Sequence, residues 1–383
     1  MRICISAGAY PTPEQPFATF IEAIAKEFTK KGHKVVVIVP QSITKLLFKR
    51  SQILPYYTEY QVNDKVIGVY RPKTLTFGNK GILGYITLKM NQLAVCNCFF
   101  KNKMEYDVIY SHFWTSAYNI MSCSKKYSIP LFVASGEDEI TLTKSIPKSD
   151  VKLLKKLVKG VICVSTKNKN ESIECNLTDV KNCIVLPNAI SMDDFRRIEK
   201  SKARNILGFN QNDFIVTFVG RFVYRKGAKR VSDAISNLND SSIKSIFIGS
   251  SMSDGNKNEK PDCIGILFQG KLNRSDIPLY LSASDVFVLP TLAEGCSNSI
   301  VEALACGLPI ISSNMEFNYD ILNSSNSILV NPLDVYEISK AIKKLKDDSL
   351  LCLQMSDSAL KTAEKLDYSQ RVDKILKFIE ERR

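Results

Sequence analysis

The chain has 383 residues, which is about twice the size of one ordinary domain, so two domains with separate cores are expected. Hydrophobic residues make up 45% and charged residues 24%, which is typical of a globular protein. The net charge of +13 would suit nucleic acid, an anionic membrane surface or phosphorylated small molecules. We find no nucleic-acid-binding signature, so nucleic acid is not expected as a partner.

The first residues, Met1 to Ser6, are typical of a strand and lack the features of a signal peptide. No uncharged apolar run is long enough to span a membrane. The eleven cysteines are odd in number and form no pair of CxxC motifs, which indicates free thiols rather than disulfides or a zinc site. We therefore expect a cytoplasmic protein, and a position at the inner face of the plasma membrane if it touches lipid.

Apolar strands alternate with amphipathic helices along the first half of the chain. A helix is expected from about Glu14 to Lys31, with Phe17, Phe20 and Ile21 among its apolar positions. The expected strands are Arg2–Ala7, Val35–Pro40, Val108–Tyr110, Leu131–Ala134, Val161–Val164 and Cys183–Leu186. Continuous apolar strands joined by helices predict a doubly wound parallel sheet.

The alternation pauses over the polar stretch Pro187–Phe209, which is typical of a linker with a short helix, and then resumes. We expect a first domain over residues 1–190 and a second over 191–364, with a last helix within 365–383 that crosses back to the first. The later elements expected are strands at Phe214–Val219, Ser245–Ile248, Ile266–Phe268, Val286–Leu289 and Pro309–Ser312, and helices at Ala228–Asn237, Ser297–Cys306 and Ser369–Glu380.

Two acidic residues stand eight positions apart where a strand gives way to a helix. Glu294 lies in the loop after the strand, and Glu302 lies two turns into the helix. Backbone amides at such a helix start can bind an anion or sugar hydroxyls. The two carboxylates would then hold different parts of one extended ligand. The alternative is an ordinary solvated loop carboxylate and a surface residue.

A second segment, from Phe218 to Gly227, places Gly220, Arg221 and Lys226 between a strand and a helix. Such a turn can bring backbone amides and two cations onto a diphosphate. The alternative is a solvated basic turn. His112 follows another strand and could face a ligand or be a satisfied histidine at a strand end.

The region from Leu289 to Pro309 resembles the Glu-x7-Glu motif of retaining GT-B glycosyltransferases, most closely glycosyltransferase family 4. The Gly220-Arg221…Lys226-Gly227 segment is similar to the donor motif of the same family. The resemblance covers nearly the whole chain. It implies an α/β protein of the GT-B fold, in which two Rossmann-like doubly wound parallel-sheet domains face each other across a cleft.

The resemblance also implies roles for residues. Glu294 would hold the donor sugar and Glu302 the ribose, while Arg221 and Lys226 would neutralise the pyrophosphate, so that neither a metal nor a cofactor is needed. His112 would touch the donor sugar and act with Glu294, Arg221 and Lys226 in catalysis. The remaining donor contacts would be Gly8, Gly220, Gly295, Cys296, Ser297 and Asn298, and the acceptor contacts Tyr10, Glu14, Gln15 and Glu137.

The expected reaction is transfer of a hexose-type sugar from a UDP- or GDP-linked donor to a saccharide or lipid-linked saccharide, in the assembly of bacterial capsule, exopolysaccharide or O-antigen. A sugar-nucleotide epimerase or a sugar phosphorylase of the same fold is the alternative. Two basic amphipathic segments, Lys45–Arg50 and a helix over Val151–Lys159, could contact an anionic membrane or pack on their own domain.

Overall fold

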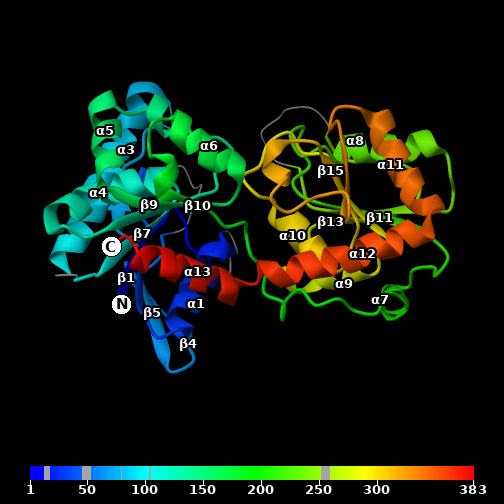
Figure 1. The fold of residues 1–383 in the computed structure, drawn as a ribbon, viewed down its shortest axis with the longest axis horizontal. Coiled ribbons are helices and arrows are strands. Elements are labelled where there is room, and N and C mark those ends of the chain that lie inside the picture. The colour runs from blue at the N-terminus through cyan, green and yellow to red at the C-terminus, as the bar shows by residue number, and fades with distance from the viewer. Residues whose placement is uncertain (13–17, 45–52, 79, 103–104, 252–258) are drawn as a thin grey trace. The chain divides into compact units, whose positions relative to one another are not determined.

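The computed structural model describes residues 1–12, 18–44, 53–78, 80–102, 105–251 and 259–383. These residues form two compact α/β units (Figure 1). The first holds Met1–Leu186 together with Tyr368–Arg383, and the second holds Pro187–Asp367. The sequence led us to expect boundaries after residues 190 and 364.

The sheet of the first unit has, in the described part of the chain, the order β10-β9-β8-β7-β1-β2-β5-β4. All of its pairs are parallel except β4 with β5, which form an antiparallel hairpin at one edge. The strands are β1 (Arg2–Ser6), β2 (Lys34–Ile38), β4 (Tyr57–Val62), β5 (Lys65–Tyr70), β7 (Val108–His112), β8 (Leu131–Ser135), β9 (Val158–Cys163) and β10 (Cys183–Val185), with a separate short pair of β3 (Gln41–Ser42) and β6 (Lys73–Thr74).

Helices cover both faces of this sheet. Successive side chains of each strand point to opposite faces, so the apolar strands present apolar side chains on both faces. Cys4 belongs to a core shared with α3, α4 and α5, whereas Ile3 and Ile5 belong to a core shared with α1 and α13. The helices are α1 (Thr19–Lys30), α3 (Gly81–Lys101), α4 (Trp114–Tyr127), α5 (Lys148–Leu157), α6 (Thr166–Glu174) and α13 (Tyr368–Glu380). The last helix of the chain thus packs on the first unit.

The second unit is built on a sheet that, within the described residues, is parallel throughout and has the order β13-β12-β11-β14-β15-β16. Figure 1 shows α8 and α11 on one side of it and α9, α10 and α12 on the other. The elements are α7 (Lys200–Leu207), β11 (Phe214–Val219), α8 (Ala228–Leu238), β12 (Ile243–Ile248), β13 (Ile266–Gly270), α9 (Ile277–Ser282), β14 (Val286–Leu289), α10 (Asn298–Ala305), β15 (Ile310–Ser313), β16 (Ser327–Val330), α11 (Val335–Asp347) and α12 (Ser349–Ala363).

The structure corrects one expected helix and adds elements that the sequence analysis did not predict. The helix expected over Val151–Lys159 ends at Leu157, because Val158 pairs with Leu131 and begins strand β9. The β4–β5 hairpin and the 21-residue helix α3 were not predicted. The expected helix at residues 14–31 is described from Thr19 to Lys30, and Phe17 and the Lys45–Arg50 segment lie outside the described residues.

Within the described residues, no helix combines the length and the apolar character needed to cross a membrane.

We predict that Gly160→Ala destabilises the first unit, because α13 is seated directly over this glycine of β9. An added Cβ would lie 2.5 Å from Cε1 of Phe378, a buried α13 ring that also packs on Phe132. Overpacking of this kind costs about 1–3 kcal/mol. Urea denaturation followed by tryptophan fluorescence measures it, because the single tryptophan, Trp114, is buried in this unit. Gly8→Ala is the control, since its Cβ would meet no atom of the described residues within 4 Å. Equal midpoints for the two variants would contradict the prediction.

Candidate active site

The two motifs of the second unit meet at the carboxyl ends of the two central strands of its sheet. Strands β11 and β14 are parallel neighbours, and the sheet extends from them in opposite directions through β12 and β15. Ligands of open α/β sheets bind at such a point, beyond the carboxyl ends of the strands. The basic turn at 220–227 follows β11, and the acidic loop at 290–297 follows β14. The topology therefore brings both motifs to the same place.

Backbone contacts hold the turn against the loop. The amide of Leu292 donates to the carbonyl of Arg225 over 2.8 Å. Buried Arg230, at the start of α8, donates through Nη1 to the carbonyl of Tyr224 (2.9 Å) and through Nη2 to the carbonyl of Pro290 (2.8 Å). Arg230 thus ties the turn and the loop together, although no sequence motif pointed to it.

Gly227 is required for this approach. Its φ of +80° is rarely adopted by residues with a side chain. A Cβ at this position would lie 2.9 Å from both the Cγ and the carbonyl oxygen of Pro290. Glycine therefore lets the turn after β11 lie directly against the loop after β14.

Glu294 is the centre of the polar contacts beyond the carboxyl ends of β11 and β14. Its side chain is buried, and it forms an ion pair with Nζ of Lys226. Thr291 Oγ1 donates to the same Glu294 oxygen over 3.0 Å, and Nη1 of Arg225 lies 4.0 Å from the other oxygen. Arg225 also donates to the carbonyl of Ala293. The structure thus brings together Glu294 and Lys226 as the sequence suggested, and adds Thr291 and Arg225.

Arg221 and Gly220 lie at the beginning of the same turn. The Arg221 residue is exposed. The carbonyl of Gly220 packs so closely on Gly249, at the end of β12, that a Cβ on Gly249 would lie 1.9 Å from the Gly220 oxygen. The neighbouring strand therefore fixes the backbone from which Arg221 projects.

Glu302 is buried in α10 rather than solvated. Its carboxylate accepts from Nη1 of Arg274 over 2.9 Å, and the guanidinium of Arg274 also lies over the ring of Phe195. Burial raises the pKa of Glu302 to about 7, and the positive charge of Arg274 opposes part of this rise. The surface alternative for Glu302 is therefore wrong, and Arg274 is a partner that the sequence analysis missed.

The residues between the two acids comprise the end of the loop and the first half of α10, a helix of eight residues that begins at Asn298. Gly295, Cys296 and Ser297 are buried, whereas Asn298 is exposed. Nδ2 of Asn188 donates to the carbonyl of Cys296 and to Oδ1 of Asn298, both over 2.9 Å. Asn188 thereby holds the loop that precedes the helix.

His112 ends strand β7 in the first unit, next to strand β1. Its ring is buried and packs against Phe20 and Phe113. Burial, together with the nearby positive charge of Arg371 on α13, lowers the pKa of His112 to about 3, so the imidazole is neutral at physiological pH. In the described part of the chain its Nδ1 atom has no hydrogen-bond partner. The alternative of a histidine with all its hydrogen bonds satisfied therefore does not fit His112.

The loop after β1 carries two of the predicted contacts. Gly8 is exposed, and among the described residues no atom lies close enough to require a glycine there. Tyr10 is buried, packs edge-on against Tyr60 at 5.2 Å between ring centroids, and has a hydroxyl without a partner among the described residues. Glu14 and Gln15 lie outside the described residues.

Glu137, an expected acceptor contact, is held by the first unit itself. Its carboxylate accepts from the amide of Trp114 (2.7 Å) at the start of α4, from the amide of Gly136 (2.9 Å) and from Oγ of Ser135 (3.0 Å). Burial raises the pKa of Glu137, and these hydrogen bonds oppose the rise. The geometry gives Glu137 a structural role at the helix start.

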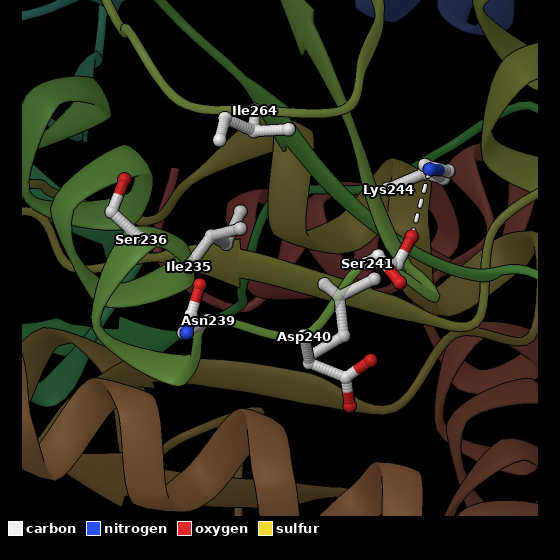
Figure 2. Close-up of a pocket in the computed structure, with 8 residues that line it drawn as sticks. Ile235, Ser236, Asn239, Asp240, Ser241, Lys244 and Ile264 are labelled. Carbon is white, nitrogen blue, oxygen red and sulfur yellow. Dashed lines mark hydrogen bonds between the residues drawn. The ribbon is translucent and has the colours of Figure 1, made fainter.

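A separate pocket of about 220 Å³ lies at the amino end of strand β12, between the end of α8 and the start of β12 (Figure 2). Its two charged side chains already have partners. Nζ of Lys244 donates to the carbonyl of Ser241 over 2.8 Å, and Asp240 pairs with Lys346 over 2.6 Å. The pocket is thus remote from the Lys226–Glu294 pair and carries none of the predicted site residues.

Residues 199–362 match the family model of glycosyl transferases group 1. The chain is 24% identical to the Bacillus subtilis protein named as teichuronic acid biosynthesis glycosyltransferase TuaC, over 95% of this chain and 94% of that one. It is 29% identical to an Escherichia coli UDP-Gal:alpha-D-GlcNAc-diphosphoundecaprenol alpha-1,3-galactosyltransferase, over 71% of this chain and 75% of that one. These relatives support glycosyl transfer as the general class of activity.

Solved structures resemble the whole chain. Sucrose-phosphate synthase from Thermosynechococcus elongatus superposes with a TM-score of 0.77, at 16% identity and over 99% of this chain and 98% of that one. HepE from Anabaena, in complex with UDP, superposes with a TM-score of 0.75, at 17% identity and over all of both chains. The predicted fold class, two Rossmann-like parallel-sheet domains as in GT-B glycosyltransferases, is confirmed.

We predict that the stability difference between Glu302→Gln and the wild type changes with pH. The pKa of Glu302 is raised on folding, so the wild type loses stability as the pH rises from about 4.5 through about 7. Glutamine does not titrate. Its stability relative to the wild type should therefore increase by about 2 kcal/mol between pH 5 and pH 8. Thermal denaturation at each pH measures the difference, and a pH-independent difference would count against a buried, titrating Glu302.

Proposed function

We propose that the protein is a retaining, metal-independent glycosyltransferase. It moves a hexose-type sugar from a UDP- or GDP-linked donor to a saccharide or lipid-linked saccharide, in the assembly of a bacterial surface polysaccharide. Support for the donor class comes from HepE, which binds UDP, and support for the acceptor class comes from relatives named for diphosphoundecaprenol-linked acceptors. The observation that carries the proposal is the ion pair between buried Glu294 and partly buried Lys226, with Arg225 near the same carboxylate and Arg221 at the start of the same turn.

The cations of the turn suit a diphosphate leaving group. When the bond between the sugar and the diphosphate breaks, negative charge accumulates on the phosphate oxygens. Lys226, Arg225 and Arg221 arise from one rigid turn, so they would stabilise this charge with little reorganisation. Positive charge supplied by side chains in this way is the basis for proposing that no metal is required.

Glu294 suits the sugar itself. Its carboxylate is held by Lys226 and Thr291, so its oxygens are oriented before a ligand arrives. A fixed, buried carboxylate accepts hydrogen bonds from sugar hydroxyls and orients the ring for attack. We assign the ribose to Glu302 and retention of anomeric configuration to the Glu294-x7-Glu302 spacing, both on the resemblance to family 4 glycosyltransferases.

His112 would contribute a hydrogen bond rather than a charge. Its lowered pKa keeps the imidazole neutral, and its Nδ1 atom has no partner among the described residues. A neutral imidazole hydrogen-bonds to an uncharged hydroxyl, which suits contact with a donor sugar. Of the proposed acceptor contacts, Tyr10 offers its unpartnered hydroxyl, whereas the Glu137 carboxylate is already occupied.

We predict that Lys226→Ala, Glu294→Ala and Arg221→Ala each lower kcat for sugar transfer by roughly 10²-fold or more, because each removes a contact to the reacting donor. The assay is release of nucleoside diphosphate in the presence of acceptor, with circular dichroism to verify folding. Lys244→Ala is the matched control, since it removes a cation of the same unit that lies at the amino end of strand β12. Unchanged turnover in Lys226→Ala would remove this side chain from the donor site.

We further predict that sugar transfer survives in excess EDTA. Loss of transfer under EDTA would contradict metal independence.

We also predict that the preferred nucleotide sugar raises the melting temperature. A ligand that binds only the folded state at about 100 times its Kd adds about 2.7 kcal/mol of stability. A thermal-shift panel of UDP- and GDP-linked hexoses measures it, and the shift should shrink in Lys226→Ala. No shift with any member would contradict this donor class.

The same donor, incubated without acceptor, separates the alternative reactions. A transferase gives at most slow hydrolysis, whereas an epimerase makes a new nucleotide sugar. A phosphorylase would leave the nucleotide sugar unchanged, and would release a sugar phosphate only from a saccharide supplied together with inorganic phosphate. Either of the last two products would overturn the proposal.

A further inference from the structure

Helix α3 (Gly81–Lys101) of the first unit is apolar on two opposite faces. One face is buried on the sheet through Leu88, Val95 and Phe99. The other carries Ile82, Ile86 and Leu93, which recur at intervals of four and seven residues and therefore share one side of the helix. The exposed fractions of these residues are 80%, 39% and 57%.

Two neighbouring residues widen this exposed stripe. Leu83 is 54% exposed, and Phe77, in the segment just before the helix, is 49% exposed. The amides of Phe77 and Gly78 both donate to Oγ1 of Thr87, over 2.9 and 3.3 Å, so this segment is fastened to the helix. We call Phe77, Ile82, Leu83, Ile86 and Leu93 the α3 surface. Contiguous exposed apolar side chains of this kind mark an interaction site.

The charges around the α3 surface favour an anionic partner. The 21 residues of α3 include no aspartate or glutamate. Lys80, which caps the start of the helix, and Lys73 are exposed, as are Lys148 and Lys152 of α5. A salt bridge from Lys89 to Asp150 (3.1 Å) ties α5 to α3. A second copy of the chain would bring the same lysines together, whereas an anionic lipid surface attracts them and accepts apolar side chains.

We infer that the α3 surface docks the protein on an anionic lipid bilayer, with Phe77, Ile82, Leu83 and Leu93 inserted among the headgroups. Since Leu88, Val95 and Phe99 hold the opposite face on the sheet, the helix lies along the membrane surface while the unit stays folded. This inference deepens the proposed function, on which it rests for the lipid-linked acceptor, because such an acceptor is presented at a membrane surface.

The test compares the wild type with the double variant Ile82→Glu and Leu83→Glu. Both substitutions lie in the first turn of α3, where acidic residues favour the helix, so folding should be preserved. Flotation uses vesicles of phosphatidylcholine with phosphatidylglycerol, and of phosphatidylcholine alone. The wild type should float with the anionic vesicles. The affinity of the variant for these vesicles should be lower by roughly tenfold or more. Leu93→Glu should weaken binding independently.

The matched control is the double variant Leu350→Glu and Leu353→Glu on α12 of the second unit, where the two leucines are 65% and 62% exposed. It adds the same charge and should float as the wild type does. Equal flotation of the Ile82→Glu, Leu83→Glu variant and the wild type would overturn the inference, and so would failure of the wild type to bind. A wild-type dimer that this variant converts to monomer would assign the surface to a second copy instead.

Transfer to a water-soluble acceptor, measured on the same samples, keeps the two proposals apart. The α3 variants should retain it, since none of these residues belongs to the proposed donor site. Intact membrane binding without any transfer would reject the proposed function and leave the docking surface standing.

Discussion

The contact between the turn after β11 and the loop after β14 fixes the geometry of the proposed donor site. Lys226 and Glu294 are 68 positions apart in sequence, and they meet because their strands are parallel neighbours. Gly227 permits the approach and Arg230 secures it through two carbonyl groups. A partly buried ion pair contributes little net stability, because desolvation of the charges opposes their attraction. We therefore interpret this pair as oriented for a ligand rather than as a stabilising device.

Burial moves two other proposed site residues toward their neutral forms. It raises the pKa of Glu302 and lowers that of His112, since the charged form of each group is poorly solvated inside the protein. The C-terminal helix strengthens the effect on His112 through Arg371.

The proposed donor chemistry and the proposed lipid contact are built on different units of the chain. The Lys226–Glu294 pair belongs to the second unit, and the α3 surface belongs to the first. Because the α3 surface consists of side chains that the fold leaves exposed, it can change without disturbing the core beneath it.

The sequence by itself determined the fold class and the two motifs, because each is written locally. Strands appear as apolar runs, and the Gly220–Gly227 and Glu294–Glu302 segments each lie at a strand end followed by a helix. The β4–β5 hairpin was missed, although the asparagine in its turn is a usual sequence signal for a tight turn. In the structure this residue, Asn63, adopts a positive φ.

Only the tertiary structure decided which groups meet and which faces stay exposed. Arg225 and Arg274 became partners of the two acids because the fold joins residues that are distant in sequence, whereas Thr291 reaches Glu294 within one loop. Helix α3 is apolar on both sides, so its periodicity could not tell which side packs on the sheet. Burial depends on neighbours that come from elsewhere in the chain, and for the same reason the shifted pKa values of Glu302 and His112 were not readable from sequence.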